Sequence, residues 1–150
     1  MGSEMCIRDR SNEPETRVAA TTAVPPRAAY DKAYGYLLEQ NYGAAEAAFA
    51  DFVVTHPKSK LAGNAQYWLG ETHYVRGNYR SAANAFLKGF KSYKSGSKAP
   101  DSLLKLAMSL SRLGQKPSAC ATFQELKRRY PRAPQHISRR SDAERQRAGC

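Results

Sequence analysis

The stretch that decides the fold is "GNYRSAANAF" at residues 77–86, because close variants of it occur twice more. The chain reads "QNYGAAEAAF" at 40–49 and "GQKPSACATF" at 114–123. Two kinds of residue recur through these stretches at steps of 37, namely Ala45, Ala82 and Ala119, and Phe49, Phe86 and Phe123. A constant period of this length is the signature of a repeat protein.

Each copy of the stretch belongs to a predicted pair of helices. In residues 63–76, apolar and aromatic side chains recur at steps of three and four, which is helical spacing. Gly77 and Asn78 interrupt the pattern, and a second helical stretch runs from Tyr79 to about Tyr93. The same reasoning predicts three pairs and one final helix, at 29–40 with 42–55, 63–76 with 79–93, 101–113 with 117–130, and about 134–147.

The small residues of the repeated stretch allow the two helices of a pair to approach closely. We predict that each repeated alanine faces a small residue of its partner helix: Ala45 faces Ala33, Ala82 faces Gly70, and Ala119 faces Ala107. The phenylalanines are expected to fill the space towards the next pair. Since one pair cannot cover its apolar face alone, neighbouring pairs stack. The prediction is an all-α solenoid, with repeats at about 28–60, 62–97 and 99–133 and a capping helix at about 134–147.

Residues 1–27 differ in composition from the repeats. The stretch "SNEPETRVAATTAVPPR" is rich in proline, threonine, alanine and charge and has no apolar stripe, so we expect a disordered lead-in. The first ten residues, "MGSEMCIRDR", fit neither the lead-in nor the repeats. We attribute them to an artefact such as a translated adaptor, and they contain no apolar segment of a signal peptide.

The net charge of +11 is concentrated towards the end of the chain. Residues 28–126 carry 12 basic and 7 acidic side chains, whereas residues 127–150 carry 8 basic and 2 acidic ones. We interpret this tail as a solvated, arginine-rich last helix. The alternative is a surface for nucleic acid or anionic lipid. The chain has no run of about 18 apolar residues that could span a bilayer.

Motifs of catalysis and metal binding are missing from the sequence. Cys6, Cys120 and Cys150 form no C-x-x-C pair and no cluster with histidine, so no metal site is expected. There is no glycine-rich phosphate loop and no nucleophile elbow. We predict a protein that is not an enzyme and that takes no cofactor, small-molecule substrate or nucleic acid.

The repeated residues match the tetratricopeptide repeat (TPR) pattern. The second unit matches it best, with Trp68, Leu69, Gly70, Tyr74, Gly77, Tyr79, Ala82 and Phe86. The first unit supplies Tyr42, Ala45, Phe49 and Pro57, and the third supplies Ala107, Gly114, Ala119, Phe123 and Pro131. The chain therefore resembles the TPR family, whose usual repeat of 34 residues is about three residues shorter.

The residues between these positions are similar to a narrower family. The stretches "YWLGETHYVRGNY" and "KAPDSLLKLAMSLSRLG" resemble the C-terminal TPR domain of the CpoB (YbgF) family of Tol-Pal accessory proteins, over about residues 28–150. The resemblance implies a periplasmic protein that binds TolA and coordinates outer-membrane constriction with septal peptidoglycan synthesis during cell division. A class A penicillin-binding protein is a second implied partner.

The same resemblance implies a signal peptide and a trimerising coiled coil ahead of the TPR domain. Neither is found in these 150 residues, so we expect a fragment that is monomeric by itself, from a longer protein that trimerises. An alternative with the same fold is a TPR scaffold of another envelope assembly complex.

In a TPR stack the first helix of each pair lines the groove that holds a partner. Asn64, Tyr67, Glu71 and Tyr74 are spaced by 3, 4 and 3 residues and share one stripe of a helix. Stepping by 37 adds Tyr30, Tyr34 and Met108 from the neighbouring pairs. We predict that these side chains form a groove for a peptide or helix, because tyrosine combines a large contact area with a polar tip. The alternative for each ring is packing between repeats.

The implied periplasmic location is an oxidising compartment, and it suggests a disulfide between Cys120 and Cys150. This bond would fasten the capping helix to the third pair. Closing such a loop would contribute about 3.5 kcal/mol by its effect on chain entropy. The alternative is a buried, reduced Cys120 with a free Cys150.

Overall fold

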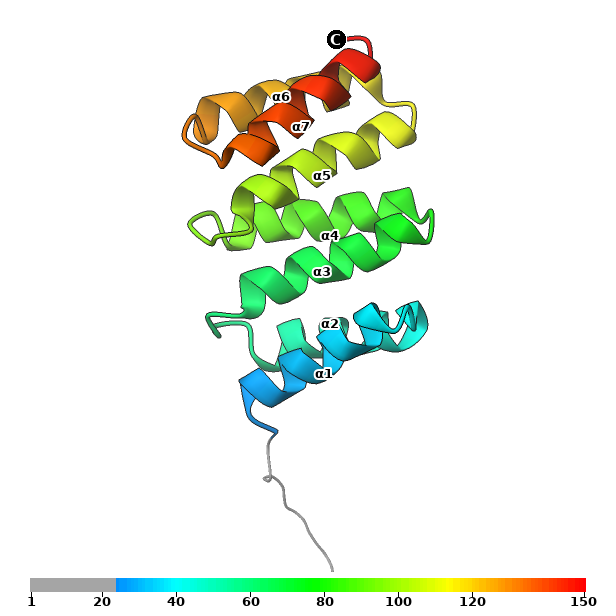
Figure 1. Ribbon diagram of the computed structural model, residues 1–150, viewed down its shortest axis with the longest axis vertical. Helices are drawn as coiled ribbons and strands as arrows, with labels where there is room; N and C mark the ends of the chain where they lie inside the picture. Colours follow the sequence, from blue (N-terminus) through cyan, green and yellow to red (C-terminus); the bar gives the residue numbers. More distant parts are fainter. Residues whose placement is uncertain (1–23) are drawn as a thin grey trace, which may run out of the picture.

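The computed structural model describes residues 24–150, which form helices and connecting loops without any strand (Figure 1). The helices are α1 (Pro26–Leu38), α2 (Tyr42–Thr55), α3 (Ala62–Val75), α4 (Tyr79–Ser92), α5 (Ala99–Arg112), α6 (Lys116–Arg129) and α7 (Gln135–Arg147). The predicted all-α solenoid of three pairs and a final helix is confirmed. The proposed artefact, most of the lead-in and Cys6 lie outside the described residues.

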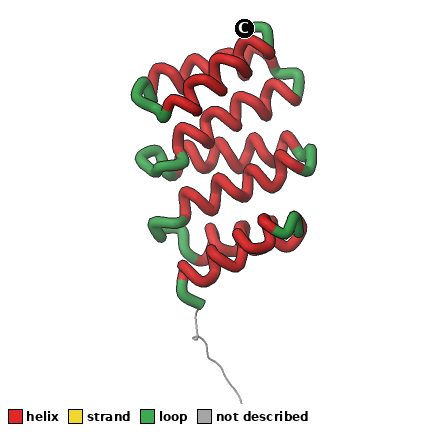
Figure 2. Tube along the Cα trace, in the orientation of Figure 1, coloured by secondary structure: helices red, strands yellow, loops and turns green. Residues whose placement is uncertain are grey.

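The connections alternate between two edges of the stack. The short turns within the pairs lie at one edge, and the longer loops between pairs lie at the other (Figure 2). Each helix packs against its neighbour in sequence, and α3 also contacts α5, as α5 contacts α7. The first helices of the pairs therefore continue into α7 along one side of the stack. No helix within residues 24–150 is long and apolar enough to cross a membrane.

The turns within the pairs repeat one backbone feature. A residue with positive φ occurs in each, namely Gln40 (59°), Gly77 (80°) and Gly114 (77°), again at steps of 37. Glycine adopts this left-handed conformation without steric cost, which explains two of the three choices. Pro100 and Pro117 stand in the first turns of α5 and α6, as predicted, where a missing N–H costs no hydrogen bond.

The repeated small residues are all buried. Ala33, Ala45, Ala82, Ala107 and Ala119 have no exposed surface. Two of the phenylalanines, Phe49 and Phe86, differ from the prediction, because the contacts that the structure shows for them lie inside their own pair. The Phe49 ring lies 6.0 Å from the Tyr30 ring, centroid to centroid, and Phe86 covers Gly70. The small residues thus make room for a ring of the same pair.

Gly70 is packed too tightly for a methyl group. A Cβ atom added there would lie 2.5 Å from Cε1 of the buried Phe86 ring. Alanine is worth about 1 kcal/mol more than glycine in a helix, but overpacking typically costs 1–3 kcal/mol. We expect Gly70→Ala to lower the free energy of unfolding by about 1–2 kcal/mol in urea denaturation.

Gly35→Ala is the matched control, because a Cβ at Gly35 in α1 meets no atom within 4 Å. We expect it to raise the free energy of unfolding by about 0.5–1 kcal/mol. Equal increases in the free energy of unfolding at both positions would show that the Phe86 ring does not exclude a methyl group at residue 70.

The apolar core consists of two clusters that meet at one side chain. One cluster is built from α1, α2 and the start of α3, around Phe49 and Phe52. The other runs from α3 to α7, around Phe86, Phe123 and Ile137. Trp68 packs against both clusters and so forms their junction.

Candidate functional site

The side of the stack formed by α1, α3 and α5 carries the predicted groove residues, and we call it the first-helix face. On α1 the Tyr30 and Tyr34 rings stack with centroids 6.3 Å apart. The Trp68 ring of α3 meets Tyr34 edge-on at 5.3 Å, and its Nε1 donates a hydrogen bond to the Tyr30 hydroxyl at 3.0 Å. These contacts join the first two pairs through an aromatic wall.

A pocket of about 240 Å³ opens between α1 and α3 on this face. It is lined by Arg27, Tyr30, Asp31, Tyr34, Asn64, Trp68 and Lys98. The structure therefore brings three predicted residues together and adds others that the sequence analysis did not assign to the groove. Trp68 could have been found, since it lies four residues after Asn64 on the same helix stripe. Lys98 lies in the loop before α5, where no periodic pattern points to a side chain.

Polar and charged groups surround the aromatic wall of this pocket. Arg27 Nε lies 3.4 Å from Asp31 Oδ1. Lys98 Nζ lies 5.2 Å from the centroid of the Trp68 ring, in cation–π range. Burial raises the pKa of Tyr30, while hydrogen bonds from Trp68 and Asn64 oppose that rise. The pocket thus offers an apolar surface edged by donors and acceptors, which suits a polypeptide segment.

Two predicted groove residues are part of the core instead. Tyr67 and Met108 are only 7% and 3% exposed, and both belong to the cluster that includes Ile137 of α7. Lys98 Nζ also lies 5.0 Å from the Tyr67 ring centroid. Burial raises the pKa of Tyr67, with the nearby Glu71 carboxylate acting in the same direction. Packing between repeats, the alternative for each ring, is therefore the role of these two side chains.

Glu71 and Tyr74 take part in a polar cluster further along the face. Lys105 Nζ lies 2.9 Å from Glu71 Oε1 and 4.5 Å from the centroid of the Tyr74 ring. Arg112 approaches the same ring and donates a hydrogen bond to the Tyr79 hydroxyl at 2.6 Å. Burial raises the pKa of Tyr74. Glu71 is paired with Lys105, and the Tyr74 ring lies against Lys105 and Arg112, so this part of the face is less available to a partner than the pocket.

Helix α7 extends the same side with a charged network. Arg140 Nε and an Arg147 amino group donate hydrogen bonds to Glu144 Oε2, at 2.9 Å and 2.7 Å. Burial alone would raise the pKa of the Glu144 carboxyl, but these two guanidinium groups lower it overall. Part of the arginine-rich tail is therefore neutralised by its own helix.

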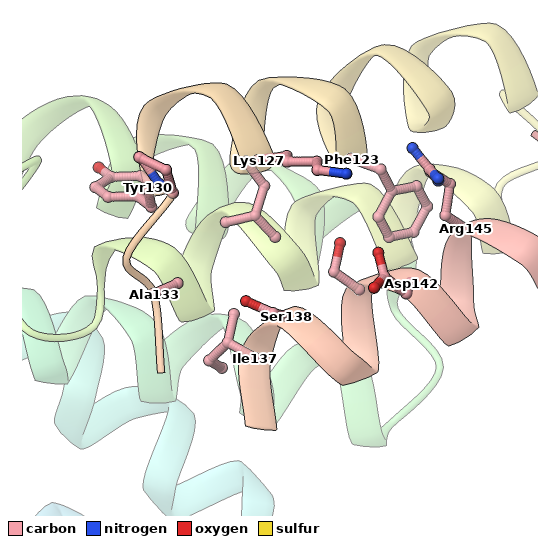
Figure 3. A pocket seen from close by; sticks show the side chains of 11 residues that line it. Phe123, Lys127, Tyr130, Ala133, Ile137, Ser138, Asp142 and Arg145 are labelled. Atoms are coloured by element: carbon pink, nitrogen blue, oxygen red, sulfur yellow. The ribbon is translucent and has the colours of Figure 1, made fainter. Parts of the chain in front are cut away.

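A smaller pocket lies between α6 and α7 (Figure 3). Phe123 and Ile137 contribute apolar side chains to its lining, and Lys127, Asp142 and Arg145 contribute charged ones. Its volume is about 120 Å³, well below the 300 Å³ or more of typical small-molecule sites. This small volume does not support a small-molecule site at this end of the solenoid.

The C-terminal end of the chain is bonded to α6. A disulfide joins Cys120 of α6 to Cys150, with the two Cα atoms 5.6 Å apart. The bond places α7 against the third pair, where Ile137 is buried. Among residues 24–150, no group of three or more His, Cys, Asp or Glu side chains is placed to hold a metal ion.

Comparison with known proteins gives two kinds of similarity. Two family models described as tetratricopeptide repeat match residues 30–90 and 101–133, which together are more than half of the chain. The cell division coordinator CpoB of Pseudomonas putida strain KT2440 is 41% identical over 49 residues, and a second CpoB sequence from Pseudomonas putida matches equally well. The match covers 33% of this chain and 18% of each relative.

Proposed function

Because the chain belongs to the tetratricopeptide repeat family, we propose that it is a protein-binding module whose first-helix face holds a segment of a partner protein. The observation that carries the proposal is the pocket between α1 and α3, where an aromatic wall stands beside the amide of Asn64 and the ammonium of Lys98. Tyrosine and tryptophan contribute most to binding when they line such a recess.

The similarity to CpoB supports a role in cell division, with TolA as the first partner to test. We extend the proposal to a periplasmic location and to a class A penicillin-binding protein as a second partner. The match spans only 18% of the length of each CpoB relative, so these assignments are proposals drawn from the relatives as whole proteins. The module acts in them by binding, without catalysis or a cofactor.

The test is a calorimetric titration of the full chain with the periplasmic part of TolA from the same source. We expect saturable binding at physiological salt, and a loss of affinity of about tenfold or more in the double variant Tyr34→Ala/Asn64→Ala, since both side chains line the pocket. Circular dichroism checks that the variant keeps its helices.

The matched control is Tyr42→Ala/Asn84→Ala, which removes the same side chains from α2 and α4, away from the pocket. It should keep the affinity of the unchanged chain. Equal losses of affinity in both variants would show that the partner binds outside the pocket. If the unchanged chain did not bind TolA, TolA would be excluded as a partner, and the assignment of the repeat fold would be unaffected.

A further inference from the structure

The loops between the helix pairs form a basic edge of the solenoid. They lie together at one edge of the stack in Figure 2. We define the basic edge as these loops with the last helical turn before each, residues 52–61, 89–98 and 126–134. It contains no Asp or Glu and nine basic residues: Lys58, Lys60, Lys91, Lys94, Lys98, Lys127, Arg128, Arg129 and Arg132.

The excess of basic over acidic side chains is much larger at this edge than at the opposite edge of the stack. The equivalent segments at the opposite edge, residues 35–41, 72–78 and 109–115, contain only Arg76, Arg112 and Glu39 as charged residues. All nine basic side chains of the basic edge except the half-buried Lys98 are exposed. The excess charge of the solenoid is therefore displayed along one side and is not spread evenly.

Hydrogen bonds hold the three loops in a fixed row. The Tyr93 hydroxyl donates to the carbonyl of Pro57 at 3.0 Å, and the Tyr130 hydroxyl donates to the carbonyl of Lys94 at 2.9 Å. These two bonds are related by the 37-residue step, so each loop is tied to the one before it. The basic side chains are consequently presented by a rigid backbone.

A pocket of about 480 Å³ lies between the first two loops. Hydroxyl, amide and ammonium groups line it, without a carboxylate: Ser59, Lys60, Gly63, Asn64, Lys91, Ser92, Tyr93, Lys94, Ser95, Gly96 and Ser97. Arg128 and Arg129 of the edge pair with Glu125, and Lys98 pairs with Asp101. Five lysines of the edge form no ion pair with a carboxylate of residues 24–150: Lys58, Lys60, Lys91, Lys94 and Lys127. Such a lining is suited to phosphate groups.

Two features favour a lipid surface over a nucleic acid. Base recognition in single strands relies on aromatic rings that are free to stack. Here the Tyr93 side chain packs on Gly63 and the Tyr130 ring on Phe90, and both hydroxyls are engaged. In addition, the edge contains an exposed apolar side chain, Val54, which is 77% exposed.

We propose that the basic edge binds the phosphate headgroups of an anionic lipid bilayer, with the pocket between the first two loops taking one headgroup. Clustered lysines next to an anionic membrane each add to the attraction, and the attraction weakens with salt. The edge and the first-helix face adjoin at Asn64, which lines both pockets, and at Lys98, which belongs to the edge and also lines the pocket between α1 and α3. The aromatic residues of that pocket, Tyr30, Tyr34 and Trp68, do not belong to the edge.

The test is co-sedimentation of the full chain with phosphatidylcholine vesicles that contain either no phosphatidylglycerol or 40% of it. We expect binding only to the anionic vesicles, with affinity falling as salt is raised. The variant Lys58→Gln/Lys60→Gln/Lys91→Gln/Lys94→Gln should lower the partition coefficient at low salt by about 100-fold or more.

The matched control removes the same charge from exposed positions outside the edge, as Lys32→Gln/Arg80→Gln/Lys116→Gln/Arg139→Gln. The partition coefficient of this control variant should fall much less. Equal losses in the two variants would overturn the proposal, because net charge alone would explain them. It would also be overturned if neutral vesicles bound equally well, or if vesicles failed to bind while a labelled oligonucleotide or inorganic phosphate did.

Discussion

Replacing Tyr67 with alanine is expected to lower the free energy of unfolding by about 3–5 kcal/mol, as for other large aromatic side chains in a core. The ring lies edge-on to Trp68, with centroids 4.9 Å apart, and 5.7 Å from Phe86. Its removal would leave a cavity between α3 and α5 that these neighbours could fill only in part. Urea denaturation followed by circular dichroism measures the loss.

Tyr67→Phe is the control for this prediction. It keeps the ring and all of its aromatic contacts, so we expect a change of less than about 1.5 kcal/mol. The alternative role, in which Tyr67 contacts a partner, makes the opposite prediction. If Tyr67→Ala kept its stability and lost affinity for TolA, the side chain would belong to the groove.

Removing the disulfide is expected to lower the free energy of unfolding by about 3.5 kcal/mol. The bond closes a loop with a sequence separation of 30, which includes all of α7 and the loop before it. The comparison is Cys120→Ser/Cys150→Ser against the parent, both in a Cys6→Ser background so that no other thiol reacts. Chemical denaturation with and without reductant gives the two free energies.

Reductant should destabilise the parent as much as the double substitution does, and it should leave the double variant unchanged. Alkylation followed by intact mass gives an independent answer. If both thiols of the parent were modified without reductant, the bond would not be present in solution.

The positions of the helix pairs could be predicted because the packing requirement repeats with the sequence. A small residue is needed wherever a ring from the same pair crosses the partner helix, so Gly70 and Ala82 mark the second pair. The predicted first and last residues of the helices were less accurate. α1 begins at Pro26 and not at 29, because proline fits the first turn of a helix as well as the loop before it.

The binding face could be predicted only in part. Helical spacing and the 37-residue step assigned Asn64 and Tyr34 to one face, and both line the pocket between α1 and α3, but the same reasoning also assigned Tyr67 to it. Whether a residue of that stripe is open or covered depends on the next helix along the stack. For Tyr67 the cover comes from α5 and from Lys98, whose position in a loop has no periodic signal.

Trp68 is the single tryptophan of the chain, and its place at the junction of the two core clusters makes it a natural spectroscopic reporter. Repeat proteins unfold as a row of coupled units, and a terminal unit can open while the others stay folded. Opening of the α1–α2 pair would move the indole into water and change its fluorescence, while most of the helical signal remained. Comparing the two signals across one denaturation curve would therefore show how strongly the first pair is coupled to the rest.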